Sequence, residues 1–240
     1  MPAWERFDFA ETTSTNDEIK KLCETAQSGK KFMVTAARQT AGRGRRGRSW
    51  ISMDGNLFVS FGVEVEARAL GQITFVIGLS LLEAIRHFAP NINVKLKWPN
   101  DVLVNDSKIS GILLEKAAGD YLVVGVGVNV AAAPQGENIS YTVASLKEAG
   151  ITTDKEAFLQ VFAKVFDERL SELKSKGFAP IREAWLNNAK NLGSKITVNM
   201  EHESKEGIFL GIDENGALLL ERDGKTEKIY AGDIFYLEEK

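Results

Sequence analysis

The 240-residue chain is predicted to fold as an α+β protein. Three strand-like runs, 93–98, 108–116 and 121–130, follow one another with only short turn sequences between them. Strands that are joined so closely pair as antiparallel neighbours. Helical patterns stand before and after this block and do not alternate with its strands, which separates the fold from a doubly wound α/β sheet. From residue 195 onwards the chain changes to short strands and tight turns.

Apolar patterns predict four helices, one of them at 72–89 because its apolar run is too long and continuous for a strand. The first follows a capping-box sequence, Thr15 with Glu18. A second capping box, Thr153 with Glu156, precedes the longest helix, and Gly177 is expected to end it. The expected helices span about residues 16–28, 72–89, 154–176 and 181–188.

The C-terminal segment has the pattern of a small β-barrel. Its four strand-like stretches are separated by the turn sequences DENG and RDGK, in which Gly216 and Gly224 can adopt positive φ. So short a β-unit is marginal alone, so we expect it to pack against the rest of the chain. The expected domains are a main domain over residues 1–190 and a C-terminal domain over residues 191–240.

The composition argues against a nucleic-acid surface and against secretion. The net charge is −3 and the pI about 5.6, whereas nucleic-acid-binding domains are usually basic. The single cysteine, Cys23, excludes an internal disulfide, indicates a reducing compartment and lies in an apolar-periodic stretch typical of core residues. The N-terminus does not resemble a signal peptide, and no apolar run approaches the ~20 residues of a membrane helix. We therefore expect a cytoplasmic protein without nucleic-acid or membrane partners.

Against this acidic background, residues 41–50 (AGRGRRGRSW) concentrate four arginines among three glycines. The segment lacks the Walker pattern, and its formal G-x-G-x-x-G match is not followed by a helix. Glycines allow a backbone to approach an anion closely, and guanidinium groups bind phosphate or carboxylate through forked hydrogen bonds. We expect a mobile loop that binds a small anion, with a solvated surface loop as the alternative. Trp50 either stacks on a flat ring or packs in the core.

Residues 97–115 (KWPNDVLVNDSKISGILLE) place polar side chains at the end of a strand. A proline breaks the strand, so Asn100 and Asp101 are presented at a turn. Asp101 offers an oxygen ligand for Mg²⁺, whose shell a phosphate chain would complete. Lys108 opens the next strand, and Gly111 allows a close backbone approach. A plain hairpin with polar turn residues explains the same pattern.

Other polar positions are open to a structural and a functional interpretation. Asn129 ends an apolar strand, where it either recognises a ligand or caps a turn. The segment 14–17 (STND) starts a helix, so it serves as an N-cap or holds a small anion or polar ring with the free backbone N–H groups. His87 and His202 stand alone, and with one cysteine they cannot form a catalytic triad or a zinc site.

The chain resembles biotin protein ligases, the enzymes that attach biotin to the carrier domains of carboxylases. The resemblance covers essentially the whole chain and implies the family's fold, a mixed, largely antiparallel central sheet with flanking helices, similar to class II synthetases, plus an SH3-like C-terminal domain. Only thirteen residues precede Ser14, which predicts the short, monofunctional form without a DNA-binding winged helix. The motifs that carry the resemblance are STN at Ser14, QTAGRGRRGRSW at Gln39, KWPNDV at Lys97, KISGILLE at Lys108 and GVGVNV at Gly125.

The resemblance implies a reaction in two steps. The carboxylate of biotin attacks the α-phosphate of MgATP, which gives biotinyl-5′-AMP and pyrophosphate; a lysine amine of a biotin carboxyl carrier protein then attacks the mixed anhydride, and AMP leaves. Because an anion must approach a polyanion, the enzyme contributes mainly positioning and charge neutralisation. Biotin, ATP and Mg²⁺ are thus the implied small molecules. Relatives are often homodimers, so a homodimer is a further possibility.

The resemblance also implies residue roles. Lys108 matches the lysine between the biotin carboxylate and the α-phosphate, so it is assigned to catalysis together with Arg45 and Arg48. Asp101 is implied as the Mg²⁺ ligand, while Arg46 receives no role. The last strand, GDIFYLEEK, lacks the arginine that relatives often place near the nucleotide. The implied biotin contacts are Ser14, Thr15, Asn16, Gln39, Gly42, Arg43, Lys108, Gly111 and Leu113. The implied nucleotide contacts are Arg45, Arg48, Trp50, Asn100 and Asn129.

Two other classes of protein are alternatives. Lipoate or octanoate ligases and transferases share the catalytic fold, but they lack the arginine-rich loop with its following tryptophan. A non-enzymatic RNA- or DNA-binding protein would use this loop together with the C-terminal barrel. The barrel sequence is acidic, however, which disfavours tracking along phosphates. Its acidic residues include Glu201, Glu203, Glu206, Asp213, Glu214, Glu221 and Asp223.

Overall fold

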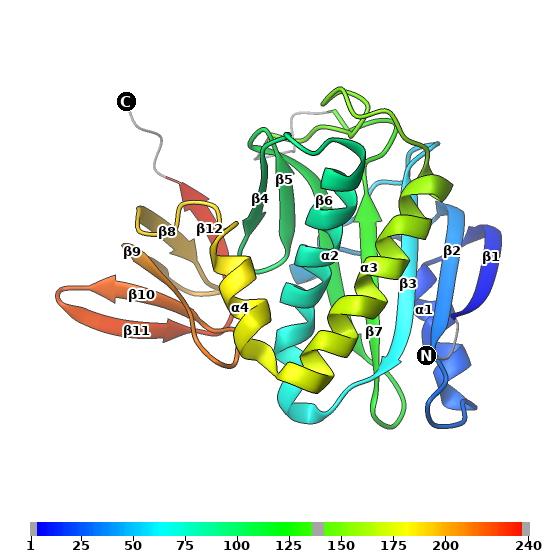
Figure 1. Cartoon of the computed structure of the whole chain (residues 1–240), viewed down its shortest axis with the longest axis horizontal. Helices are drawn as coiled ribbons and strands as arrows, with labels where there is room; N and C mark the ends of the chain where they lie inside the picture. Colours follow the sequence, from blue (N-terminus) through cyan, green and yellow to red (C-terminus); the bar gives the residue numbers. More distant parts are fainter. Residues whose placement is uncertain (1–3, 136–141, 237–240) are drawn as a thin grey trace.

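A seven-stranded sheet forms the centre of the molecule, and a smaller sheet stands at one side of it (Figure 1). The computed structural model describes residues 4–135 and 142–236, so the last four residues of the expected C-terminal domain lie outside the described residues. The central order is β1-β2-β3-β7-β6-β5-β4, in which β1 and β2 are parallel and all other neighbours antiparallel. The expected α+β class, with its mixed and largely antiparallel sheet, is confirmed. The strands are β1 Glu5–Thr12, β2 Phe32–Gln39, β3 Leu57–Glu64, β4 Val94–Lys97, β5 Asp101–Val104, β6 Ser107–Lys116 and β7 Tyr121–Val128.

The sequence does not predict β1 and β5. β1 lies at the edge of the sheet, and seven of its eight side chains are exposed or half-buried, so no apolar face marks it. β5 has four residues between two turns, which is too short for a periodicity to be recognised. Both strands matter to the site, because β1 leads into the helix that carries the STN motif and β5 begins at Asp101.

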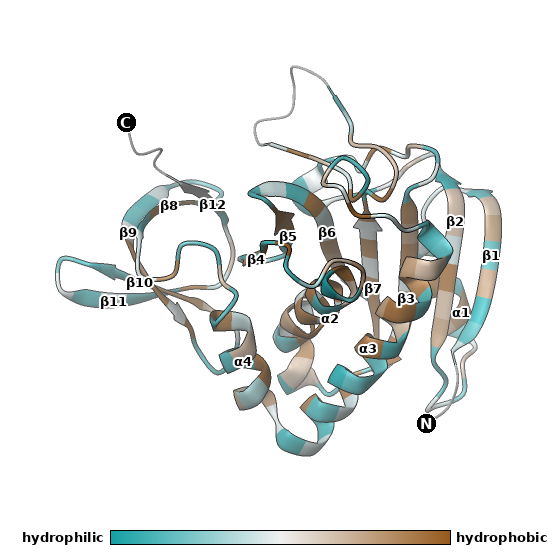
Figure 2. Ribbon diagram, turned by 45° about the horizontal axis from the view of Figure 1, so that its top comes forward, coloured by the Kyte–Doolittle hydropathy of each residue, from teal (hydrophilic) through white to brown (hydrophobic). Residues whose placement is uncertain are grey.

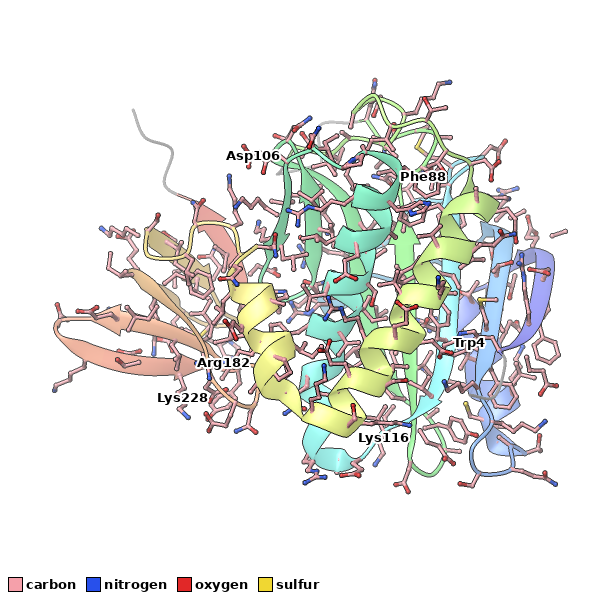
Figure 3. All side chains as sticks on the ribbon, in the orientation of Figure 1. Trp4, Phe88, Asp106, Lys116, Arg182 and Lys228 are labelled. Carbon is pink, nitrogen blue, oxygen red and sulfur yellow. The ribbon has the colours of Figure 1, made fainter. Side chains whose placement is uncertain are left out.

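Helices cover both faces of the sheet. α2 (Ile73–Phe88) and α3 (Lys155–Lys176) lie side by side on one face, α4 (Phe178–Leu186) follows beside α2, and α1 (Thr15–Glu24) packs on the opposite face (Figure 1). Apolar side chains fill the space between α2, α3 and the sheet (Figure 3), where Phe61, Phe158, Phe162 and Phe166 are fully buried. Under α1, Cys23 is buried as expected, and this burial raises the pKa of its thiol to about 11.

Both expected capping boxes are wrong in detail. The N-cap of α1 is Ser14, whose side chain makes no capping bond, and the carboxylate of Glu18 accepts from Thr12 Oγ1 at 2.7 Å. In α3 the cap is Asp154, whose Oδ1 accepts from the next two free backbone N–H groups at 2.9 Å each. The N-cap of α3 is therefore Asp154 and not the expected Thr153, and its short carboxylate satisfies these donors. Gly177 ends α3 as expected, with φ of 74°.

The C-terminal strands form a curled antiparallel sheet in the order β11-β10-β9-β8-β12 (Figure 2). Within the described residues its two outer strands, β11 and β12, are not paired with each other, so the ring of strands is not closed as the expected barrel would be. The DENG turn touches the main sheet, where Trp98 Nε1 donates to Gly216 O at 3.1 Å. The strands are β8 Lys195–Asn199, β9 Ser204–Ile212, β10 Leu218–Arg222, β11 Lys225–Ile229 and β12 Asp233–Tyr236.

One helical stretch, Ala67–Phe88, is long and apolar enough by composition to cross a membrane. It consists of the 3₁₀ turn η2 (Ala67–Gln72) and α2. Of its most apolar 18-residue window, 61% is buried within the protein. α2 packs against α3, α4 and the sheet, so its apolarity is accounted for by the core.

Candidate active site

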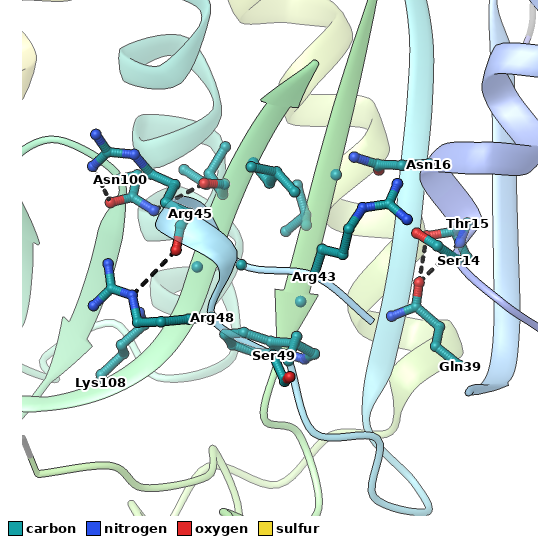
Figure 4. A pocket seen from close by; sticks show the side chains of 18 residues that line it. Ser14, Thr15, Asn16, Gln39, Arg43, Arg45, Arg48, Ser49, Asn100 and Lys108 are labelled. Atoms are coloured by element: carbon teal, nitrogen blue, oxygen red, sulfur yellow. Dashed lines mark hydrogen bonds between the residues drawn. The ribbon is translucent and has the colours of Figure 1, made fainter. Parts of the chain in front are cut away.

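One pocket gathers most of the motif residues on the face of the sheet that also carries α1. Figure 4 shows its two ends: the start of α1 with Gln39 at one end, and Arg45, Arg48, Asn100 and Lys108 at the other. β6 and β7 run between the two ends. The lining residues are Ser14, Thr15, Asn16, Gln39, Arg43, Gly44, Arg45, Arg48, Ser49, Trp50, Asn100, Lys108, Gly111, Ile112, Leu113, Gly125, Val126 and Gly127.

The end beside α1 is a network of amides and hydroxyls. Thr15 donates to Gln39 Oε1 from its backbone N–H at 2.9 Å and from Oγ1 at 3.1 Å. The hydroxyl of Ser60 lies 2.6 Å from Thr15 Oγ1 and 2.5 Å from Asn16 Oδ1, and Asn16 Nδ2 donates to Glu115 Oε2 at 2.7 Å. Thr15, Asn16 and Ser60 are all buried. Such a fixed set of short polar groups suits a small neutral polar ring that offers both donors and acceptors.

Arg43 belongs to this end and not to the cationic one. Its guanidinium donates to both carboxylate oxygens of Asp17, at 2.9 and 2.6 Å, and to Glu115 Oε2 at 3.3 Å. The hydrogen bonds from Arg43 lower the pKa of the Asp17 carboxyl. The pKa of Glu115 is also lowered, since hydrogen bonds from Asn16 and Lys20 outweigh the effect of its burial. Arg43 is therefore neutralised by the protein, and it ties the arginine loop to α1.

Three glycines form the floor between the ends. A Cβ on Gly127 would lie 2.3 Å from Trp50 Cε2, and one on Gly111 would lie 3.0 Å from Trp50 Cζ3. Gly111 and Gly127 are paired across β6 and β7, so the indole lies on a patch that has no side chains. A Cβ on Gly125 would lie 2.3 Å from Asn16 Oδ1. The alternating glycines of the GVGV segment thus make room for the groups that line the pocket.

The arginine loop is a compact hairpin in this structure. Gly44 N donates to Arg48 O at 2.6 Å, and Trp50 N donates to Gly42 O at 3.0 Å. Its tip is the 3₁₀ turn η1 (Arg45–Gly47), where Arg46 adopts φ of 54°. A Cβ on Gly42 would lie 2.6 Å from Trp50 O, so this glycine is required by the close approach of the loop's own two arms.

The other end of the pocket is a cluster of partly buried cations. Lys108 Nζ lies 2.7 Å from Asp101 Oδ1, and it lies 5.8 Å from the centre of the Trp50 ring. Arg45 Nη1 donates to Asn100 Oδ1 at 3.2 Å. Burial lowers the pKa of Arg45, and burial is also the main cause of the lowered pKa of Lys97. Burial disfavours the charged form of these side chains, and an anion that binds beside them would stabilise that form.

One carboxylate of the small sheet reaches the arginine loop. Asp233, the first residue of β12, lies 3.0 Å from Arg48 Nη2 and 3.8 Å from an Nη1 atom of both Arg45 and Arg46. Arg46 Nη1 also donates to Asn199 O at 3.3 Å. Arg46 thus points towards the C-terminal strands and does not line the pocket between the two ends.

Three residues that the resemblance places in the site do not line this pocket. Gly42 lies behind Trp50, and Asp101 faces the cavity only through its ion pair with Lys108. Asn129 is buried; its Nδ2 donates to Ala144 O at 3.2 Å, and its Oδ1 accepts from Asn56 at 3.5 Å. Asn129 holds neighbouring backbone in the described structure, so its contact with a nucleotide stays a prediction.

Some residues of the site are missed by the sequence reasoning. Ser60 is a polar residue within an otherwise apolar strand, and Glu115 is a charge near the end of another, so both carried a weak signal. Gly125 and Gly127 were visible only as part of a motif. Asp233 gave no signal, because its contacts with the loop span 185 residues or more of the sequence.

The acidic side chains near the pocket suit a metal ion that binds together with a phosphate-bearing ligand. Within residues 4–135 and 142–236, no group of three or more His, Cys, Asp or Glu side chains is placed to hold a metal ion. Mg²⁺ commonly takes one or two carboxylates and completes its shell with phosphate oxygens and water. Asp101, among the cations where phosphates would lie, is consistent with that mode.

The fold and this two-ended pocket define a binding site for a ligand with a polar end and an anionic end, and comparison with known proteins gives the family. Residues 8–129 match the biotin/lipoate A/B protein ligase family, and residues 192–237 match the biotin protein ligase C-terminal domain. The chain belongs to the biotin/lipoate A/B protein ligase family.

Particular relatives are similar over nearly the whole chain. The biotin--[acetyl-CoA-carboxylase] ligase of Paracoccus denitrificans is 38% identical, with 95% of this chain and 99% of the relative covered. The bifunctional ligase/repressor of Escherichia coli is 36% identical over 92% of this chain and 70% of its own length. The biotin protein ligase of Aquifex aeolicus in complex with biotin and ATP superposes with a TM-score of 0.83, at 30% identity, over 96% of this chain and 97% of that one.

Proposed function

We propose that the protein is a biotin protein ligase, which forms biotinyl-5′-AMP and pyrophosphate from biotin and MgATP and then transfers biotin to a lysine of a carrier protein. The observation that carries this proposal is the pairing of a buried amide–hydroxyl network with a cluster of partly buried cations, Arg45, Arg48 and Lys108, in one pocket. The ureido ring of biotin matches the first end, and the triphosphate of ATP matches the second. The relatives named for these ligands support the same conclusion.

In the first step the protein binds and orients two anions. Thr15, Asn16 and Gln39 hold the ureido ring, so the valeryl carboxylate extends over the glycine floor towards Lys108. Lys108 lies between that carboxylate and the α-phosphate and offsets the repulsion as they approach. Arg45 and Arg48 hold the phosphates, and Trp50 covers the adenine. The remaining members of the proposed biotin set are Ser14, Gly42, Arg43, Gly111 and Leu113, and those of the nucleotide set are Asn100 and Asn129.

Mg²⁺, bound by the triphosphate and Asp101, would neutralise negative charge on the phosphates. In the second step the carrier lysine attacks the mixed anhydride as a neutral amine, and AMP leaves. The hairpin of the arginine loop covers the pocket, and this cover limits the access of water to the reactive anhydride. The pocket therefore acts through position and charge, which agrees with the absence of a nucleophile–base pair among the residues that line it.

The carrier is a protein or domain of a biotin-dependent carboxylase, as the names of the relatives suggest. We also propose a division into a catalytic domain over residues 1–190 and a C-terminal domain over residues 191–240. The lack of nucleic-acid partners and a cytoplasmic location remain predictions from the sequence, and a homodimer is a possibility that the resemblance leaves open.

The proposal is tested by the exchange of labelled pyrophosphate into ATP. We expect exchange when biotin is present and none in its absence, because the reverse of adenylation needs the biotinyl adenylate. Lipoate and octanoate are the matched acids, since they share the carboxylate and lack the ureido ring. Exchange that lipoate supports and biotin does not would assign the protein to the lipoate branch of its family.

A further inference from the structure

The residue of the C-terminal sheet that contacts the arginine loop, at the cationic end of the pocket, is an acid and not a base. Asp233 begins β12, and its side chain is only 20% exposed. Arg48 Nη2 donates to both of its carboxylate oxygens, at 3.2 and 3.0 Å, while Arg45 and Arg46 approach to 3.8 Å. A single carboxylate therefore faces three of the four arginines of the loop.

The backbone around Asp233 fixes its position. Asp233 is paired with Asn199 across β12 and β8, and a Cβ on the preceding Gly232 would lie 2.7 Å from Val198 Cγ1, so the chain runs close against β8 there. The backbone also accepts from the loop, because Arg45 Nη1 donates to Gly232 O at 3.4 Å and Arg46 Nη1 donates to Asn199 O at 3.3 Å. The loop thus has a complete docking site on the C-terminal sheet.

We propose that Asp233 is the counter-ion of the arginine loop when no substrate is bound. It competes with the phosphates of the substrate for the arginine side chains. The inference rests on the proposed function, since it takes these arginines to be the phosphate ligands. Asp233 is a positioning residue: it acts on the reaction through Arg45, Arg46 and Arg48.

The charge balance explains why a polyanion displaces Asp233. Asp233 alone does not offset three guanidinium groups, and Asp101, which also acts on Arg45, is paired with Lys108. Burial still lowers the pKa of Arg45 in the presence of both carboxylates. A polyphosphate brings several negative charges to the same groups and can bind two guanidinium groups at once. Once it is bound, the fixed charge of Asp233 repels it. Asp233 therefore weakens phosphate binding and favours the release of pyrophosphate after adenylation.

The inference also gives Arg46 a function. Its side chain points to Asn199 and Asp233 and does not line the main pocket, so it connects the loop to the C-terminal sheet. Arg48, with the most exposed of the three side chains, is the residue that exchanges Asp233 for phosphate.

The test is calorimetric titration of inorganic pyrophosphate with Mg²⁺ into the full chain, without biotin. Asp233→Asn keeps the shape of the side chain and removes its charge. We expect it to bind pyrophosphate about fivefold more tightly than the unsubstituted protein, since partly exposed ion pairs contribute up to about a factor of five each. Asp223→Asn is the matched control: Asp223 lies in the exposed RDGK turn, forms no ion pair within the described residues, and its change should leave the affinity unaltered.

Unchanged or weaker binding of pyrophosphate by the Asp233→Asn variant would overturn the inference, because Asp233 would then not compete for the arginines. If that variant does not fold, hydrogen exchange of the unsubstituted protein tests whether Asp233 and pyrophosphate compete. Adding pyrophosphate should then increase exchange in residues 227–236 while it protects residues 42–50; protection of both segments would refute competition. Pyrophosphate exchange with biotin is a separate readout, so the proposed function can fail while the competition stands.

Discussion

Gly127 shows how a single residue shapes the pocket. The indole of Trp50 lies directly against its backbone, so Gly127→Ala would place a methyl group within 2.3 Å of Cε2. The ring must then move from the position in which we propose that it covers the adenine, and aromatic stacking on a base contributes about 1–3 kcal/mol. We expect at least about fivefold weaker binding of ATP, measured by calorimetry, with the fold retained in circular dichroism.

Gly78→Ala is the control for this change. Gly78 lies within α2, and a Cβ there would meet Leu96 and Trp185 only at the ordinary contact distance of 3.6 Å. We expect Gly78→Ala to raise the free energy of unfolding by about 0.5–1 kcal/mol, because alanine favours helix more than glycine does. If both variants bind ATP as the unsubstituted protein does, the ring position over Gly127 has no part in nucleotide binding.

In the proposed mechanism, Lys108 is the residue on which the chemical step depends most. Lys108→Ala removes the cation beside the reacting carboxylate and phosphate, and we expect biotin-dependent pyrophosphate exchange to fall on the order of 100-fold. Lys116→Ala, at the exposed end of the same strand, is the matched control and should retain exchange. Near-normal exchange in a folded Lys108→Ala protein would remove Lys108 from its proposed role.

Among the elements, the long and strongly periodic ones were predictable from the sequence. α3 was recognised because its buried face repeats over several turns, and α2 because its apolar run is too long and continuous for a strand. β1 and β5 were missed because neither has an apolar face long enough to detect. The arginine loop was recognised by its composition. Its hairpin was not, because the carboxylates that pair with its arginines, Asp17 and Asp233, come from other parts of the chain.

The arginine loop is the element whose state we expect to depend on ligand. It is tethered by partly exposed ion pairs, which are individually weak. We expect trypsin to cleave it in the protein alone and to leave it intact when biotin and MgATP are both present, because bound ligands remove its open state. Mass spectrometry of the fragments locates the cuts. Equal cleavage in both conditions would show that the ligands do not order the loop.

For the whole molecule, the site draws on residues from Ser14 to Asp233. The motif residues could be named from the sequence, and the pocket brings together twelve of the fifteen that were assigned to it, all except Gly42, Asp101 and Asn129. Contacts between the C-terminal sheet and the loop could not be named, because no local pattern marks a carboxylate that pairs across 185 residues. The main sheet thus supplies the pocket, and the smaller sheet supplies the partner of its loop.

The central claim is tested most directly by the mass of a carrier domain. A purified biotin carboxyl carrier domain is incubated with this protein and MgATP, in parallel with biotin or with lipoate, and its intact mass is measured. We predict that the mass increases by that of one biotinyl group when biotin is present, that the change maps to a single lysine, and that lipoate produces no change. A carrier that is modified by lipoate and not by biotin would contradict the account.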